Sequence, residues 1–150
     1  MKNTNVDVRS QAELDKALRN GLYPTCCGSA EFQANGKYCL AVKDSAKLTV
    51  YGTCVVAAQD TSHVRAKGKS KVNATGNSHI IAQDFSRITA HECCHIHVQG
   101  MAVVDVYDAC SVIAVSCTKI TAHDTASVHT QGNCQVVAFD KATIEISDKC

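Results

Sequence analysis

The chain has 150 residues, a formal net charge of +1 at neutral pH, one Pro and no Trp. This length is typical of one domain that is large enough to bury a core, and the charge provides no overall field to attract nucleic acid or an anionic membrane. The sequence contains no run of about 18 apolar residues and no apolar segment at its start, so it predicts neither a membrane span nor a secretory signal peptide. We expect a location in the cytoplasm or on a virion.

The first 23 residues differ from the rest of the chain and contain one helix signal. Ser10 and Glu13 have the spacing of a capping box, in which both side chains bind backbone N–H groups at the start of a helix. A short helix over residues 11–18 is therefore predicted. It should end at Asn20 and Gly21, which favour the backbone conformation of a helix C-terminus.

From Phe32 onward, a large apolar residue recurs at every eighth position without an insertion. The series is Phe32, Leu40, Leu48, Val56, Val64, Val72, Ile80, Ile88, Ile96, Val104, Val112, Ile120, Val128, Val136 and Ile144. A smaller apolar residue usually follows two positions later, then Gly or an acid, then Ala, Ser or Cys. The repeating unit is V-x-A-x-(G/D)-x-(A/S/C)-x, and such a fixed period indicates a repeat architecture.

The repeat also alternates between apolar and polar positions. Past residue 32, every Lys, Arg and His stands at an odd position, whereas the repeat residues are even-numbered. A period of two residues is that of a β-strand with one buried and one solvated face. Since eight residues are too few for a pair of helices, residues 24–150 are predicted to form an all-β solenoid that residues 1–23 cap.

The Gly and acid positions indicate the size of one coil. Taken every sixteen residues, one set favours Gly: Gly36, Gly52, Gly68, Asp84, Gly100, Ser116, Gly132 and Asp148. The other set favours acids: Asp44, Asp60, Gly76, Glu92, Asp108, Asp124 and Asp140. Two eight-residue sides per coil therefore predict about eight coils of 16 residues. At about 4.8 Å per strand, they would form a flattened roll roughly 38 Å long.

Stretches such as SAKLTVYGTCVVAAQD and TKITAHDTASVHTQGN, preceded by VRSQAELDKALRNG, resemble the octapeptide-repeat β-solenoid proteins of bacterial and phage genomes. The resemblance covers nearly the whole chain and implies a solenoid fold and a phage or bacterial setting. The family has no assigned catalytic residues, so the resemblance implies no activity. This chain has more Cys and more outward His than the family pattern requires.

Five of the ten cysteines stand in the small inward column of the repeat: Cys54, Cys94, Cys110, Cys134 and Cys150. They replace Ala and Ser there, so we expect space-filling thiols in a reducing compartment. With 16-residue coils, Cys94 should stack on Cys110 and Cys134 on Cys150, within reach of a disulfide. Their column explains these residues without oxidation, but the pattern leaves oxidation open.

The segment HECCHIHV brings three His and two Cys together at positions 91–98. His95 and His97 should point outward on one strand just after Cys93, a combination found in zinc sites, but a closed zinc site needs four ligands. His63, His79 and His95 should stack on three successive coils, where they would resist simultaneous protonation or share a metal ion. The alternative, which we favour, is an exposed polar column without a ligand.

A second set of rings, sixteen residues apart, comprises His91, Tyr107, His123 and Phe139. These rings should form a ladder on the sheet opposite to the one that carries His97. A row of rings on a flat sheet offers a stacking surface for a sugar or a base. The alternative, which we favour, is that the rings stack on one another and only stabilise the sheet.

Five cations are expected to cluster near the Gly corner: Arg65, Lys67, Lys69, Lys71 and Arg87. Such a cluster is able to hold an anionic partner. Lysines on a β surface more often protect the sheet against aggregation, and we favour that interpretation.

Beyond these cations, several outward positions hold apolar residues: Ile81, Phe85, Met101, Val103, Ile113, Val115 and Cys117. Phe85, Met101 and Cys117 should follow one another in a single column. The sequence therefore predicts a contiguous apolar patch, which is typical of a protein interface.

The repeat stays in phase through Ile144 and Ile146, and no capping segment follows in the sequence. The interior and strand edges of the last coil should then be open to other chains. We expect self-association through this end or contact with another protein, and the alternative is a last strand that bends over the opening.

The sequence contains no nucleophile–base arrangement, no Gly-rich phosphate loop and no paired inward carboxylates, so we expect neither an enzyme nor a cofactor. It favours a rigid scaffold or binding module of a phage or bacterial assembly, which presents side-chain ladders to a protein or a glycan. The alternative is a metal- or redox-binding protein that uses the outward His and Cys.

Overall fold

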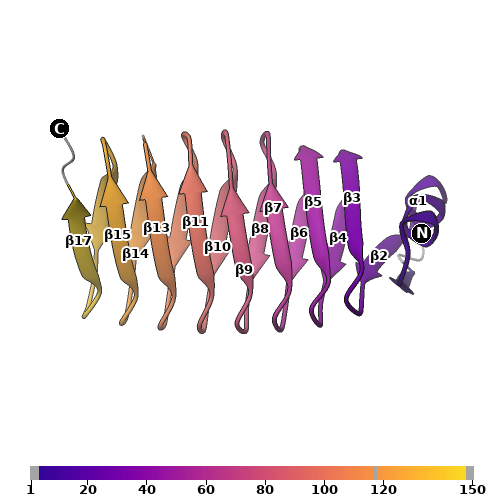
Figure 1. The fold of residues 1–150 in the computed structure, drawn as a ribbon, viewed down its shortest axis with the longest axis horizontal. Coiled ribbons are helices and arrows are strands. Elements are labelled where there is room, and N and C mark those ends of the chain that lie inside the picture. The colour runs from indigo at the N-terminus through magenta and orange to yellow at the C-terminus, as the bar shows by residue number, and fades with distance from the viewer. Residues whose placement is uncertain (1–3, 117, 148–150) are drawn as a thin grey trace.

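The structure is a computed structural model that describes residues 4–116 and 118–147. In these residues a helix, α1 (Gln11–Arg19), accompanies strands that form two parallel sheets, sheet A and sheet B (Figure 1). Sheet A contains β1 (Asn5–Val8), β2 (Tyr23–Cys26), β4 (Cys39–Val42), β6 (Val55–Ala58), β8 (Lys71–Ala74), β10 (Arg87–Ala90), β12 (Val103–Val106), β14 (Lys119–Ala122) and β16 (Gln135–Ala138). Sheet B contains β3 (Glu31–Gly36), β5 (Lys47–Gly52), β7 (His63–Ala66), β9 (His79–Ala82), β11 (His95–Gln99), β13 (Ser111–Val115), β15 (Ser127–Gln131) and β17 (Thr143–Ser147).

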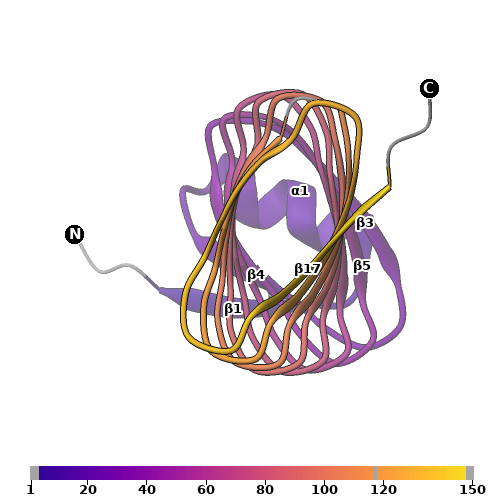
Figure 2. The ribbon, with the colours of Figure 1, turned by 90° about the vertical axis from the view of Figure 1, so that its left-hand side faces the viewer.

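From β2 onward, each strand pairs in parallel with the strand sixteen residues further along the chain. In sheet A, Val72 pairs with Ile88 and Ile88 with Val104, and in sheet B, Ile80 pairs with Ile96. The chain thus winds alternately through the two sheets, and its coils superpose when viewed along the long axis (Figure 2). The predicted two-sided β-solenoid is confirmed, with eight two-strand coils from β2–β3 to β16–β17 and a further turn made by β1 and α1.

The core consists of the even-numbered repeat residues, which point between the sheets. Val64 is only 2% exposed, whereas its neighbour Arg65 points into solvent. The small inward column lies beside the corners and holds Ala, Cys, Ser or Thr, apart from the half-buried Tyr38 near its N-terminal end. A buried hydroxyl in this column can bind the chain itself: Ser78 Oγ donates to the carbonyl of Thr75 at 2.6 Å. The column therefore tolerates small polar residues because the corner backbone supplies an acceptor.

The backbone conformation of the corners explains their preference for Gly or acids. Corner acids such as Asp108 and Asp124 have φ values of 55°, the left-handed region that Asp tolerates better than most residues. Their carboxylates also bind the preceding coil: Glu92 N donates to Asp108 Oδ2 at 2.9 Å. At the other corner, a Cβ on Gly52 would lie 2.7 Å from the carbonyl oxygen of Gly36, so only Gly fits.

Helix α1 closes the N-terminal end of the solenoid. The hydroxyl of Ser10 accepts a hydrogen bond from Glu13 N at 3.3 Å, as the N-cap of the helix should. Leu14 and Ala17 are buried against the first coil. The predicted helix is thus confirmed and extends one residue further, to Arg19. Among the described residues, no helix has the length and apolarity to span a membrane.

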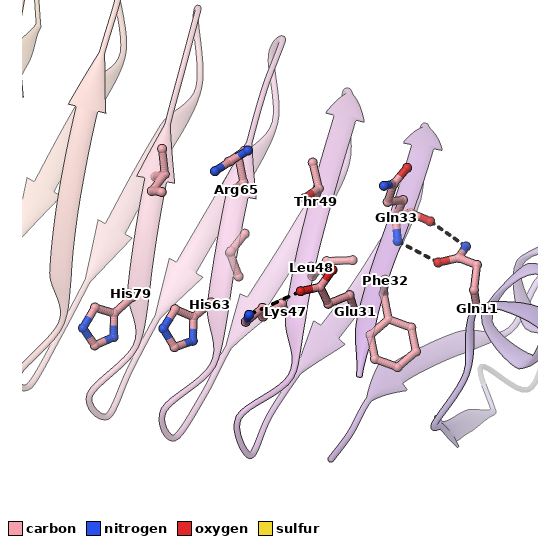
Figure 3. A pocket seen from close by; sticks show the side chains of 12 residues that line it. Gln11, Glu31, Phe32, Gln33, Lys47, Leu48, Thr49, His63, Arg65 and His79 are labelled. Carbon is pink, nitrogen blue, oxygen red and sulfur yellow. Dashed lines mark hydrogen bonds and ion pairs between the residues drawn. The ribbon is translucent and has the colours of Figure 1, made fainter. Parts of the chain in front are cut away.

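The N-terminal end also contains a strand that the sequence did not indicate. β1 pairs in parallel with β2, so α1 stands where a strand of sheet B would otherwise lie. The side-chain amide of Gln11 acts like strand backbone toward β3: Nε2 donates to Gln33 O at 2.9 Å, and Oε1 accepts from Gln33 N at 2.8 Å (Figure 3). This pair satisfies part of the free edge of β3.

Candidate binding surfaces

The expected ring ladder lies on sheet A. His91, Tyr107, His123 and Phe139 follow β10, β12, β14 and β16, and the centroids of successive rings are 4.6, 4.6 and 4.8 Å apart. Neighbouring rings are nearly parallel, at angles of 5° to 9°. His91 Nδ1 also lies 3.8 Å from a carboxylate oxygen of Asp108 on the next coil.

In this stack each ring covers a face of its neighbour, so the ladder presents ring edges to solvent along its length. The outer face of Phe139 is not covered by another ring, and this residue is 48% exposed. The ladder therefore stabilises sheet A by ring stacking, and the face of Phe139 at its C-terminal end is open to a sugar or a partner.

The expected histidine column lies on sheet B. The ring centroids of His63 and His79 are 4.8 Å apart with an angle of 8°, and those of His79 and His95 are 5.0 Å apart with an angle of 36°. Burial, and then repulsion from His63 and His95, lowers the pKa of His79 below its usual value. A positive charge on His63 or His95 therefore opposes the protonation of His79.

The geometry of the column does not suit a shared metal ion. Two nitrogen ligands of one zinc ion can lie at most about 4.2 Å apart, because each Zn–N bond is about 2.1 Å long. Parallel rings at 4.8 Å hold equivalent nitrogens further apart than this. His97 stands between Ile81 and Ile113 of the neighbouring strands, and Cys93 is exposed in the turn before β11. The described residues contain no group of three or more His, Cys, Asp or Glu that could hold a metal ion.

The cation cluster wraps around the Gly corner from sheet B to sheet A. Arg65, Lys67, Lys69 and Lys71 are successive outward residues of β7, the corner and β8, and Arg87 pairs with Lys71 in sheet A. Within the described ranges, none of the five forms an ion pair. Lys67 Nζ lies 5.3 Å from the ring centre of Tyr51, a cation–π contact. We call these five residues the cationic band.

A shallow depression of about 820 Å³ crosses sheet B beside the cationic band (Figure 3). It spans the outer faces of β3, β5, β7 and β9, and Gln11 of α1 bounds it at one end. The residues that line it include Gln11, Glu31, Gln33, Lys47, Thr49, His63, Arg65, His79 and Ile81. Lys47 forms an ion pair with Glu31 at 3.3 Å. The sequence analysis missed this depression, although the 16-residue register alone places Lys47 in the column of His63.

The predicted apolar patch is less continuous than expected. Phe85 and Met101 follow one another at the Gly corner and are 58% and 59% exposed. Val115 and the outward isoleucines Ile81 and Ile113 lie on sheet B, whereas Val103 lies on sheet A beyond the corner. His97 separates the two isoleucines, and Gln83 and Gln99, whose amides form a hydrogen bond of 3.2 Å, separate sheet B from the corner. Cys117 lies outside the described residues.

The cysteines that the structure describes are free thiols: Cys26, Cys27, Cys39, Cys54, Cys93, Cys94, Cys110 and Cys134. Burial, with a smaller effect of Cys27, raises the pKa of Cys26 to about 12. A thiol–thiol hydrogen bond with Cys94, together with burial, raises the pKa of Cys110. Buried thiols with raised pKa values are poor nucleophiles, which fits space-filling residues. The expected stack of Cys134 on Cys150 involves a residue outside the described ranges.

The last described coil, β16 and β17, leaves its interior open. Inward residues that are fully buried in earlier coils are here half-buried, as in Val136 and Ile144, or exposed, as in Ile146 at 65%. The outer face of Phe139 opens toward the same side. We call this surface the C-terminal face. Its core residues are exposed, whereas α1 covers the core at the N-terminal end.

Comparisons with models of known protein families, with curated proteins and with solved structures found no match to this chain.

Proposed function

We propose that this protein is a non-enzymatic rigid scaffold of a phage or bacterial assembly, which joins to a second copy of itself through the C-terminal face. Its outward columns would then be free to bind a protein or a glycan. The observation that supports this proposal is the difference between the two ends. α1 and Gln11 cover the first coil, whereas Ile146 and Phe139 leave the last described coil open.

A second copy fits the C-terminal face for geometric reasons. β16 and β17 run in opposite directions on the two sheets and both have a free edge in the described residues. A twofold axis perpendicular to the solenoid axis brings each edge against an antiparallel edge of the partner, so both sheets continue through the interface. Edge strands that continue in this way satisfy their backbone groups and bury the open core.

The N-terminal end limits such an assembly to two copies. The outer side of α1 carries exposed charged residues, among them Glu13 and Lys16, which do not resemble an open strand edge. A tail-to-tail pair would therefore be a closed rod with a helix at each end. Two times eight coils give a rod of sixteen coils.

The molar mass in solution tests this proposal. Light scattering coupled to size exclusion should give twice the chain mass of 16.0 kDa. Ile146→Lys should give a monomer with unchanged circular dichroism, because this exposed position has room for Lys in the free chain but not in the interface. Ile113→Lys, a matched change on an exposed position of sheet B, should leave the dimer intact. A monomer of the unaltered chain at high concentration would overturn the proposal.

A further inference from the structure

The histidine column, the cationic band and the depression meet on one half of sheet B. Lys47, His63, His79 and His95 occupy one column on four successive coils. Arg65 stands in the next column, two residues beyond His63 on β7. We call these five residues the cationic groove. Figure 3 shows the imidazoles of His63 and His79 in line with Lys47, and Arg65 above this line.

We propose that the cationic groove binds an extended acidic polysaccharide, a chain of uronic acid residues that lies along the solenoid axis. This inference rests on the proposed function only in treating the solenoid as a rigid binding scaffold. The glycan class and the surface that binds it do not follow from the open C-terminal face.

The spacing of the groove fits such a polymer. Successive members of the column are about 4.8 Å apart, the distance between neighbouring strands. A 1,4-linked pyranose chain in an extended form advances by a similar distance for each sugar and turns successive sugars to roughly opposite sides, so a carboxylate can meet a basic side chain on about every second coil. Because the sheets are rigid, the column needs little reordering when it binds a partner of matching period.

The groove also has the chemistry that a charged sugar requires. Arg65 makes no ion pair within the described residues and is exposed, so its guanidinium is free to bind a carboxylate with two hydrogen bonds. Ile81, half-buried beside Arg65 in the next coil, offers an apolar surface to the C–H face of a pyranose ring. Glu31, which pairs with Lys47, places a negative charge at the N-terminal limit of the groove.

Protonation of the histidines should control the affinity. Around His79 the facing groups are His63 and Arg65 of β7, and His95 and His97 of β11, with Cys93 in the preceding turn. The nearby corner acids, Asp60 and Glu92, are already bonded to the backbone N–H groups of Asp44 and Gly76. In the free protein, burial and the neighbouring His63 and His95 oppose the protonation of His79. A bound polyanion removes this opposition, so binding should strengthen as the pH falls through the titration range of His.

Nucleic acid fits the groove less well. Proteins that bind single strands usually stack bases on aromatic side chains. Phe32, which lines the depression, is instead buried in the core, and Tyr51 of β5 lies under the ammonium group of Lys67. The column therefore supplies charge and hydrogen-bond donors without a stacking surface for bases.

Titration calorimetry with an oligogalacturonate tests the proposal. At low salt, binding should be about tenfold tighter at about pH 5.5 than at about pH 7.5, because each exposed ion pair adds a modest amount and three histidines gain charge. Arg65→Gln should weaken binding about threefold to tenfold at both pH values. His79→Asn should reduce the dependence on pH. The matched controls outside the groove, Lys119→Gln on sheet A and His129→Asn on β15, should bind as the unaltered chain does.

Several outcomes would overturn the proposal: no binding at the lower pH, equal binding of a neutral glycan, or equal or tighter binding of single-stranded DNA or polyglutamate. A loss of affinity in the two controls as large as that in Arg65→Gln would overturn it as well. Ile146→Lys should bind the oligogalacturonate as the unaltered chain does. A result that contradicts the dimer can therefore be distinguished from a result that contradicts polysaccharide binding in the cationic groove.

Discussion

Ser62 and Ser78 occupy equivalent positions in the small inward column, and both are fully buried. Ser78 Oγ donates to the carbonyl of Thr75 at 2.6 Å, whereas Ser62 Oγ has no hydrogen-bond partner among the described residues. A buried hydroxyl without a partner costs about 1–3 kcal/mol of folding free energy. The same column accepts Ala elsewhere, at Ala46 and Ala102, so a methyl group fits the space.

We therefore expect Ser62→Ala to leave the free energy of unfolding unchanged or to raise it by about 1 kcal/mol. Ser78→Ala should lower it by about 1 kcal/mol, because this substitution removes a formed hydrogen bond. Urea denaturation followed by circular dichroism measures both values. An equal loss in the two variants would mean that the Ser62 hydroxyl is as well bonded in solution as that of Ser78.

At this scale, the sequence was sufficient to place side chains but not to orient them. The period of two separates inward from outward residues, and the 16-residue register predicts that His63 stacks on His79. Both patterns place the rings of the ladder in one column and favour their stacking, but the angles of 5° to 9° between neighbouring rings depend on rotamers. The same holds for the thiol of Cys94, which turns toward the carbonyl oxygen of His91 at 3.2 Å.

Among the elements, α1 was predictable and β1 was not. Ser10 and Glu13 signal the start of the helix locally, and Asn20 and Gly21 signal its end. The four residues of β1 carry no repeat, and their partner strand lies beyond the helix. The pairing of β1 with β2 therefore depends on tertiary packing and not on a local sequence pattern. The contact of Gln11 with β3 is of the same kind, because no periodicity marks a side chain that replaces a strand.

The contact between Gln11 and β3 should contribute measurably to stability. Gln11→Ala should lower the free energy of unfolding by about 1 kcal/mol, because two hydrogen bonds to Gln33 are lost at an edge that water can reach. Lys16→Ala, an exposed change on the same helix, should have a small effect. Hydrogen exchange should also become faster at the amide of Gln33 in Gln11→Ala alone. Unchanged protection of that amide would contradict the role given to Gln11.

The whole molecule behaves as a stack in which each coil contacts only its neighbours. In such a repeat protein, stability is roughly a sum over coils and over the interfaces between them. Removal of a complete coil loses one interface, but every remaining strand still meets a strand of its own sheet. Removal of half a coil instead transfers all later strands to the opposite sheet.

Deletion of residues 83–98 should therefore be tolerated better than deletion of residues 83–90, although it removes twice as many residues. The longer deletion joins Ala82 to Gln99, so Gly100 takes the corner place of Asp84 and β9 meets β13 in register. The shorter deletion joins Ala82 to His91, so β11 takes the place of β10 beside β8 in sheet A and His95 meets Lys71. The histidine column would be cut, because His95 would move to sheet A while His63 and His79 stay on sheet B. Thermal unfolding followed by circular dichroism should show one cooperative transition for the longer deletion and a lower midpoint for the shorter one. The reverse order would mean that the two corners are interchangeable and that the unit of this solenoid is eight residues rather than sixteen.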